Sequence, residues 1–262
     1  MAKIRINDAI NLNPTQFNCV EDYGCITDIK NWVDVLALYK TLKQQLFPKK
    51  IFLVLDDLAQ AEYTSMHACH DDRLYIPEHI SEQLSDDENE QEYSALALHY
   101  YIQQFLAAEH QQHLSDFGQK MQHYDRADFE TLMLINKNPL PCLDTDLDVK
   151  IADVPSEPLK LAMLPNGYFS CDFDPFENFT IIQFMHSFGF DFIGLGAALL
   201  GFIKTDKCHL DANNCEAVMQ GLSSIYPFNT AEYAAFKQLI CSQDYLLLPY
   251  SESPQEYANL YD

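Results

Sequence analysis

The chain has 262 residues, and its 39 Asp and Glu against 16 Lys and Arg give a formal net charge of −23. A field of this sign repels phosphate backbones, which argues against nucleic-acid binding. Hydrophobic residues make up 48% of the chain, enough for the core of one large domain or two small ones. No apolar run reaches the length of a membrane span and no secretion signal is recognisable, so we expect a soluble, cytoplasmic protein.

Eight cysteines are scattered along the chain, and none of them forms a CxxC pair. A chain of this length can build its core without disulfide bonds, which are rare in the cytosol. We therefore expect free thiols.

Hydrophobic periodicity predicts helices alternating with strands over residues 1–138. A short strand is expected at Lys3–Ile6. Apolar residues at helical spacing run from a possible cap at 27–28 to Pro48, which predicts an amphipathic helix. The run KIFLVL at Lys50–Leu55 is rich in β-forming residues and is bounded by turn signals, so we expect a buried strand there.

The longest helix is expected from about Glu92 to Leu114, and a shorter helical stretch at about Asp128–Ile135. The stretch Ser85–Glu92, in front of the long helix, carries five acids in eight positions. These acids form either a docking site for a basic protein or a solvated loop at the positive end of the helix dipole. The dipole argument favours the loop.

Residues 164–203 give the most consistent local signals, and we expect them to form the nucleus of the fold as a strand, a helix and a strand. Polar and apolar residues alternate over Gly167–Phe173, which predicts a strand with one buried face. The signals for the helix and for the second strand follow directly.

Asp174 lies where an N-cap is expected, Pro175 at the first helical position, and Glu177 at the position that completes a capping box. Gly189 is expected to end this helix. The apolar run Phe190–Ile203 then predicts a buried strand that turns at its glycines into a second buried element.

Four prolines punctuate residues 139–159 and are expected to interrupt helices and central strands alike. We interpret this segment as a connection between an N-terminal region, residues 1–138, and a C-terminal region, residues 160–262, with a single domain as the alternative. Together the elements predict an α/β or α+β fold with a mixed sheet and flanking helices. Further elements are expected beyond the nucleus: helices at Asp211–Ile225 and Thr230–Cys241, and a strand at Tyr245–Leu248.

The sequence MHACHDD is the first candidate for chemistry, because it contains the potential metal ligands His67, Cys69, His70, Asp71 and Asp72. Imidazole with thiolate suits zinc. The spacing is poor, however, because no second pair of ligands lies nearby. A turn that carries ordinary polar residues is the alternative interpretation, and we favour it.

His110 and His113 are the second candidate, since two histidines three residues apart on one helix face can point at one ion. The surrounding sequence AEHQQHL matches neither HExxH nor HxxEH, the arrangements that place a general base beside zinc. Histidines on a solvated helix face are the alternative interpretation.

Carboxylates at strand ends are the third candidate. Asp172 closes the strand predicted before the capped helix, and Asp191 opens the strand after it. Asp56 and Asp57 follow the strand at Lys50–Leu55. Such carboxylates in α/β proteins can hold magnesium or act as acid and base.

The motif Gly194-Leu195-Gly196 matches only part of a dinucleotide-binding fingerprint, and neither a GxSxG nor a P-loop sequence is present. We therefore predict no cofactor. Zinc and magnesium stay open as alternatives at the clusters described above.

These observations support three hypotheses, in this order. The first is a non-enzymatic, acidic, cytoplasmic protein that acts by protein–protein interaction, such as an inhibitor or an immunity-type partner that covers a basic protein. The second is a small-ligand-binding module with its site in the crevice beyond the strand ends. The third is a metal-assisted hydrolase or transferase that uses either Asp172 with Asp191 or His110 with His113.

Overall fold

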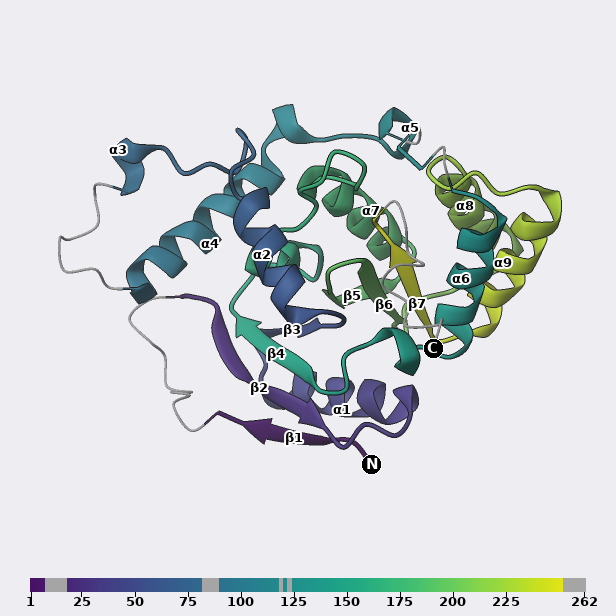
Figure 1. The fold of residues 1–262 in the computed structure, drawn as a ribbon, viewed down its shortest axis with the longest axis horizontal. Coiled ribbons are helices and arrows are strands. Elements are labelled where there is room, and N and C mark those ends of the chain that lie inside the picture. Colours follow the sequence, from purple (N-terminus) through teal and green to yellow (C-terminus); the bar gives the residue numbers. More distant parts are fainter. Residues whose placement is uncertain (8–17, 82–89, 118–119, 122–123, 252–262) are drawn as a thin grey trace.

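The computed structural model of the chain describes all residues except 8–17, 82–89, 118–119, 122–123 and 252–262 (Figure 1). The described residues form a seven-stranded mixed sheet in the order β1-β2-β4-β3-β5-β6-β7, with helices on both faces. This architecture confirms the predicted fold class. No helix among these residues is long and apolar enough to cross a membrane.

The strands are β1 (Lys3–Ile6), β2 (Glu21–Thr27), β3 (Lys50–Val54), β4 (Leu147–Ala152), β5 (Phe190–Leu195), β6 (Leu199–Lys204) and β7 (Tyr245–Pro249). The helices are α1 (Trp32–Gln45), α2 (Leu58–Ala68), α3 (Glu78–Ser81), α4 (Glu90–Leu106), α5 (Leu114–Phe117), α6 (Arg126–Lys137), α7 (Pro175–Ser187), α8 (Ala212–Ser223) and α9 (Thr230–Ser242). Short 3₁₀ helices occur at Ala108–His110, Leu140–Cys142 and Pro158–Met163.

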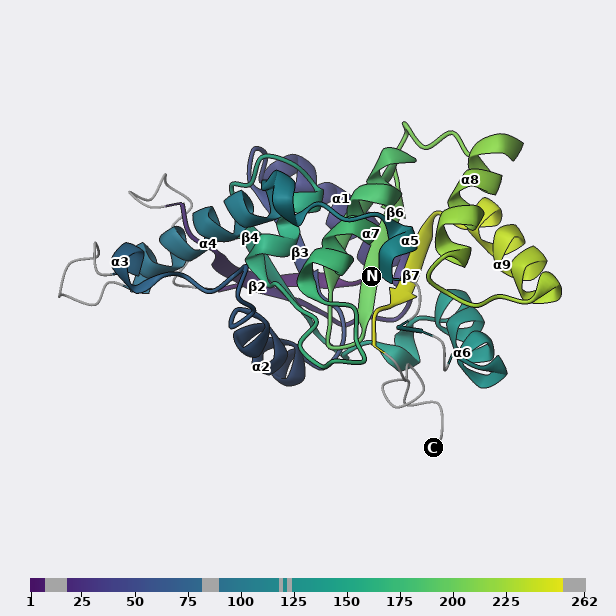
Figure 2. The ribbon, with the colours of Figure 1, turned by 90° about the horizontal axis from the view of Figure 1, so that it is seen from above.

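β3 lies at the centre of the sheet, where it pairs antiparallel with β4 and parallel with β5. Its side chains alternate between two hydrophobic clusters. Phe52 and Val54 belong to the cluster that includes α2, α4 and α7, whereas Ile51 and Leu53 belong to the cluster that includes α1. Figure 2 shows α1 and α2 on opposite sides of the strands. Burial on both faces explains why the sequence of this strand is apolar throughout.

α7 begins as the sequence predicts. The Asp174 side chain accepts hydrogen bonds from the backbone N–H groups of Phe176 at 2.8 Å and Glu177 at 2.9 Å. The Glu177 side chain in turn accepts a hydrogen bond from the Asp174 N–H at 2.7 Å, which completes the capping box. Gly189 follows the helix with a φ of 86°, and β5 and β6 then form an antiparallel pair.

The strand predicted at Gly167–Phe173 is wrong, because this segment is an irregular loop. The Asn178 side chain of α7 donates hydrogen bonds to the carbonyl groups of Asn166 at 3.0 Å and Phe173 at 3.1 Å. Side-chain hydrogen bonds thus take the place of pairing with another strand. Gly167 has a φ of 112°, and a Cβ atom there would collide with the Phe173 carbonyl oxygen, so the loop needs glycine at this position.

Two helix boundaries also differ from the prediction. α4 ends at Leu106 instead of Leu114, because the backbone is extended at Ala107 and a 3₁₀ turn follows. α1 is capped by Asn31 and not by residues 27–28, since the Asn31 side chain accepts the hydrogen bond from the Asp34 N–H at 2.8 Å. Most of the acidic stretch predicted to precede the long helix lies outside the described residues.

The proline-rich segment 139–159 contains β4, which lies between β2 and β3 in the sheet. The prolines flank this central strand and do not interrupt it: Pro139 and Pro141 precede it, and Pro155 and Pro158 follow it. The division of the chain into domains stays a prediction.

Cys215 in α8 and Cys241 in α9 form a disulfide, which contradicts the expectation that all thiols are free. The two cysteines are 26 residues apart in the sequence, and this spacing matches no motif that predicts a disulfide. The other six cysteines take part in no disulfide: Cys19, Cys25, Cys69, Cys142, Cys171 and Cys208.

Candidate functional site

α2 covers one face of the sheet and exposes its outer side to solvent. Carboxylates hold its first turn in place: Asp57 accepts a hydrogen bond from the Gln60 N–H, and Asp144 accepts from the N–H groups of Asp57 and Leu58, each at 3.1 Å. Leu58 of α2 packs against the core, and the fully buried residues of the helix are all small, which lets it lie close to the sheet: Ala61, Thr64, Ser65 and Ala68. Most of the large side chains of α2 lie on its outer side.

An exposed group of large side chains, which we call the aromatic patch, joins α2 to the loop before α7. The aromatic patch consists of Tyr63, Met66 and His67 from α2 and of Tyr168 and Phe169 from the loop. The His67 ring lies 4.5 Å from the Tyr63 ring and 4.8 Å from the Tyr168 ring, and the Tyr168 ring lies 5.4 Å from the Phe169 ring. Met66 is three residues from Tyr63 and lies beside it on the helix. Four of the five side chains stay 40–55% exposed (Tyr63 51%, Met66 55%, Tyr168 47%, Phe169 40%).

A cavity of about 280 Å³ opens beside the aromatic patch. Rings of the aromatic patch form part of its wall, and Asp71 and Asp174 belong to the wall as well. Arg73 holds these two carboxylates together, because its Nη2 atom lies 2.6 Å from Asp71 and 3.0 Å from Asp174. Lys120, which pairs with Glu177, belongs to the wall as well, so the carboxylates of this cavity have cations beside them and the aromatic rings are the groups that can attract a further cationic side chain.

Four carboxylates, which we call the acidic strip, lie on or beside β2, β4 and α2: Asp22, Glu62, Asp144 and Asp148. The buried Lys150 donates hydrogen bonds to Asp22 at 2.7 Å and to Glu62 at 3.1 Å. Burial alone would lower the Lys150 pKa, but these two carboxylates raise it. Burial, with the negative charges of Asp22 and Glu62, also raises the pKa of Asp148 although Lys150 opposes the shift. Negative charge in the acidic strip thus exceeds what one lysine compensates.

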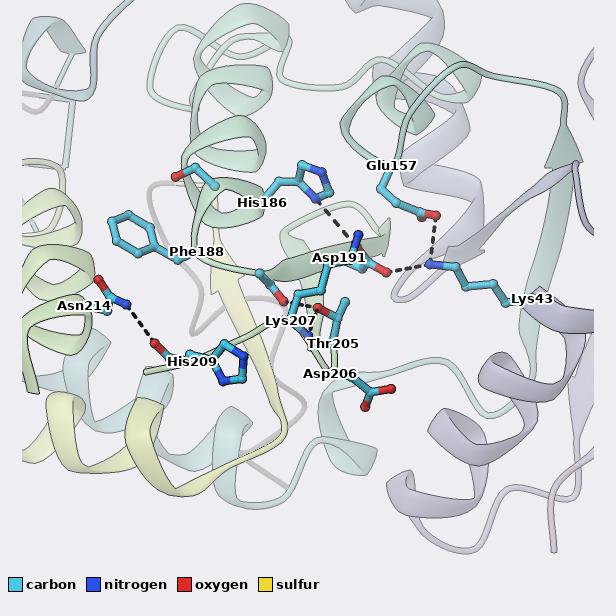
Figure 3. Close-up of a pocket in the computed structure, with 12 residues that line it drawn as sticks. Lys43, Glu157, His186, Phe188, Asp191, Thr205, Asp206, Lys207, His209 and Asn214 are labelled. Atoms are coloured by element: carbon cyan, nitrogen blue, oxygen red, sulfur yellow. Dashed lines mark hydrogen bonds and ion pairs between the residues drawn. The ribbon is translucent and has the colours of Figure 1, made fainter. Parts of the chain in front are cut away.

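A larger pocket, of about 730 Å³, lies at the opposite end of α7, where β5 begins and β6 ends (Figure 3). Lys43 of α1 bridges the two carboxylates of its wall, at 2.5 Å from Asp191 and 2.8 Å from Glu157. The His186 Nδ1 atom lies 3.6 Å from Asp191. We call this cavity the α7 C-terminal pocket.

A buried charge network supports the wall of the α7 C-terminal pocket. The fully buried Lys160 lies 2.9 Å from Glu157 and donates hydrogen bonds to the Tyr39 hydroxyl at 2.9 Å and to the Ile51 carbonyl at 3.0 Å. Burial tends to raise the pKa of Glu157, but Lys160 and Lys43 outweigh burial and lower it to about 2. Glu157 therefore stays ionised at every physiological pH.

The first predicted metal cluster does not converge on one point. His67 is part of the aromatic patch, and Asp71 pairs with Arg73. Cys69 caps the C-terminus of α2, where burial raises the pKa of its thiol. Among the residues that the structure describes, no three His, Cys, Asp or Glu side chains gather closely enough to hold a metal ion.

His110 and His113 do not share a helix face, because α4 ends before both of them. The His110 Nδ1 atom lies 3.1 Å from the Gln104 carbonyl oxygen, and the ring packs 5.0 Å from the Phe176 ring. His113 is exposed, and its backbone N–H donates to Asp116 at 2.9 Å. The two histidines thus have separate structural surroundings.

Asp172 and Asp191 lie at opposite ends of α7 and form no pair. Asp172 precedes the N-terminus of this 13-residue helix and Asp191 follows its C-terminus, so roughly 20 Å of helix separates them. The Lys120 side chain donates to the Asp172 carbonyl group at 3.1 Å, whereas Asp191 belongs to the α7 C-terminal pocket. The predicted acid–base pair is therefore not assembled.

Asp57 is the N-cap of α2, as described above, and its neighbour Asp56 is buried at the end of β3. The Asp56 Oδ1 atom is 3.4 Å from the Ala198 N–H, and its Oδ2 atom has no hydrogen-bond partner among the described residues. Burial raises the pKa of Asp56 to about 8. Asp56 is thus buried where the surroundings favour its neutral form, and it lies apart from both cavities described above.

Sequence reasoning missed most of the residues that these two cavities bring together. The polarity pattern places Tyr168 and Phe169 in a strand, and their exposure follows from the loop that replaces it. Lys43 lies on the partly exposed side of a predicted helix, and only the fold places it beside Asp191, 148 residues away. No local signal marks such long-range neighbours.

Comparisons with protein families, with curated proteins and with solved structures found no match to this chain.

Proposed function

We propose that this protein acts by binding a basic protein, as an inhibitor or immunity-type partner does, through the surface formed by the aromatic patch and the acidic strip. The observation that carries this proposal is the contiguous aromatic patch, whose large side chains remain exposed beside an open cavity. Apolar side chains clustered in this way are typical of interaction surfaces.

The aromatic patch has the composition expected of an interface centre. Tyrosines and methionines are enriched at interfaces, and tyrosines are prominent among the residues that contribute most to binding. Tyr63 and Tyr168 are held on either side of His67, so little side-chain entropy remains to be lost on association. Burial of these two tyrosines by a partner is therefore expected to dominate affinity.

The acidic strip favours a partner whose surface is positively charged. Its carboxylates flank α2 on the side of β2 and β4, where burial first and the neighbouring carboxylates second raise the pKa of Asp148. A positively charged surface is attracted to such a field and a negative one is repelled. The net charge of −23 acts in the same direction over longer distances.

The cavity beside the aromatic patch supports a more specific contact. A lysine or arginine of the partner would place its charge against the rings of the patch, at the mouth of a cavity whose carboxylates, Asp71 and Asp174, are already paired with Arg73. Such a cation gains a cation–π contact.

Capture on immobilised protein tests the proposal. A lysate of the source cells is applied at low salt, and the retained proteins are eluted with a salt gradient and identified by mass. The expected result is one basic protein in a stoichiometric complex that dissociates at moderate salt. The affinity of the purified complex is then measured by calorimetry.

Variants of the surface make the test specific. Replacing both Tyr63 and Tyr168 by alanine is expected to weaken the complex roughly 1000-fold, because interface tyrosines that dominate binding contribute about 2 kcal/mol each. Glu62→Gln is expected to slow association more than it speeds dissociation. The matched controls are Phe47→Ala, next to the end of α1 on the other side of the strands from α2, and Glu130→Gln in α6, and both side chains are exposed. Retention of no basic protein at low salt, or equal losses in the controls, contradicts the proposal.

A further inference from the structure

We propose that the α7 C-terminal pocket binds a small anionic molecule, one that carries a phosphate or carboxylate group. This site lies at the end of α7 remote from the aromatic patch and does not depend on the proposed protein partner. The pocket has room for more than an inorganic ion, since its volume of about 730 Å³ is within the range of small-molecule sites.

Donor groups without partners line the pocket. The Lys207 ammonium group and the His209 ring make no hydrogen bond or ion pair within the part of the chain that the structure describes. Only the backbone carbonyl of His209 is engaged, by the Asn214 side chain at 2.8 Å. The His186 Nδ1 atom lies 3.6 Å from Asp191, and its Nε2 atom makes no hydrogen bond to the described residues. Three nitrogen groups are therefore available to bind an anion.

The carboxylates of the same wall already have cationic partners. Lys43 lies between Asp191 and Glu157, and Lys160 neutralises Glu157 from the buried side. Asp206 is exposed at the rim, and Figure 3 shows its carboxylate directed away from Asp191. The unpartnered groups that face the pocket, among the residues described, are thus mainly basic.

The electrostatic surroundings reinforce this imbalance. Three lysines, Lys43, Lys50 and Lys160, lie within 4 Å of carboxylates of only two residues, Glu157 and Asp191. With Lys207 and Asp206 of the pocket wall included, four lysines stand against three carboxylates, so this region lacks the excess of negative charge that the chain carries as a whole, −23. Such a region favours a small anion, because the acidic surface around it repels larger polyanions.

The arrangement of the donors indicates how a ligand would lie. Figure 3 shows His186 and Asp191 on one side of the pocket and His209 and Asn214 on the other, with Lys207 and Thr205 between them. An anionic group beside Lys207 would be within reach of donors on both sides. The rest of the pocket has room for the remainder of the ligand, whose polar groups would hydrogen-bond to the pocket wall.

The test is a calorimetric titration of the full chain with two probes, glycerol phosphate and succinate. The decisive variant carries Lys207→Ala together with His209→Ala, and the matched control carries Lys137→Ala together with His99→Ala. All four positions lie at the surface, so folding is expected to survive and is verified by thermal unfolding. The control removes the same charges from α6 and α4, away from the pocket.

At least one probe is expected to bind saturably, and the decisive variant is expected to lose at least about tenfold in affinity, whereas the control changes by less than about twofold. Preference for glycerol phosphate identifies a phosphate site and preference for succinate a carboxylate site. Absence of saturation by both probes up to about 10 mM, or an equal loss of affinity in the control, overturns the proposal.

Discussion

Replacement of the buried Asp56 by asparagine is expected to stabilise the protein at neutral and alkaline pH. An asparagine side chain would keep the volume of the carboxyl group and its contact with the Ala198 N–H, and it would have no charge to bury. The wild-type carboxyl group has a pKa of about 8 in the folded chain, against an ordinary value of 3.8. The folded chain therefore holds a proton, between these pH values, that the unfolded chain has released.

The sign and size of the effect follow from this difference. Because the unfolded state binds fewer protons than the folded state between about pH 4 and pH 8, wild-type stability falls as the pH rises through this interval. Each pH unit corresponds to about 1.4 kcal/mol, so the contribution of Asp56 at pH 7 is a destabilisation of roughly 4 kcal/mol. Asp56→Asn removes this pH-dependent term and leaves those of all other groups in place.

Urea unfolding of both proteins at pH 5 and pH 8 measures the effect. The variant should exceed the wild type in free energy of unfolding, and this difference should grow by roughly 3.5 kcal/mol between the two pH values. A difference that is the same at both pH values would refute the reasoning, because it would mean that Asp56 is ionised in the folded core.

Three further substitutions have defined outcomes. Asp174→Ala removes the side chain that caps α7 and its contact with Arg73, so the free energy of unfolding in urea should fall by about 1 to 2 kcal/mol. An unchanged unfolding midpoint would show that Glu177 caps α7 alone. Lys160→Met leaves the buried Glu157 carboxylate without one of its cations, so the free energy of unfolding in the same assay should fall by about 3 kcal/mol. A rise would mean that the buried ion pair stabilises the fold less than an apolar side chain does. Gly194→Ala places a Cβ atom against the Leu53 carbonyl oxygen, at a residue whose φ is 151°. The soluble yield and the midpoint of thermal unfolding should therefore both fall sharply. An unchanged midpoint would show that β3 and β5 can move apart without loss of stability.

Local sequence signals predicted the structure correctly where the residues that contact one another lie within a few positions in the sequence. The capping box of α7 and the turn between β5 and β6 belong to this class, and both are present as predicted. The loop at 167–173 could not be predicted in this way, because alternation of polar and apolar residues does not show whether a neighbouring strand is available for pairing. Asn178 decides the outcome by satisfying the loop carbonyls from within α7.

The candidate sites depend on contacts that no local pattern contains. The aromatic patch requires α2 to meet a loop about 100 residues later, and the sequence presents His67 as a potential metal ligand although its ring packs between two tyrosines. The early end of α4 separates His110 from His113, and the apolar periodicity does not mark this boundary. Residue types were thus recognised, but the neighbours that determine their roles were not.

The strand order has a consequence for how the chain acquires its structure during synthesis. β3 is made early, but its neighbours arrive much later: Lys50 pairs with Ala152, and Leu53 pairs with Gly194. The apolar edges of β2 and β3 are therefore without their partners while about 100 further residues emerge, and such edges are prone to aggregate. Pairings this distant in sequence also make folding slow. We expect the nascent chain to depend on chaperones until β5 has left the ribosome.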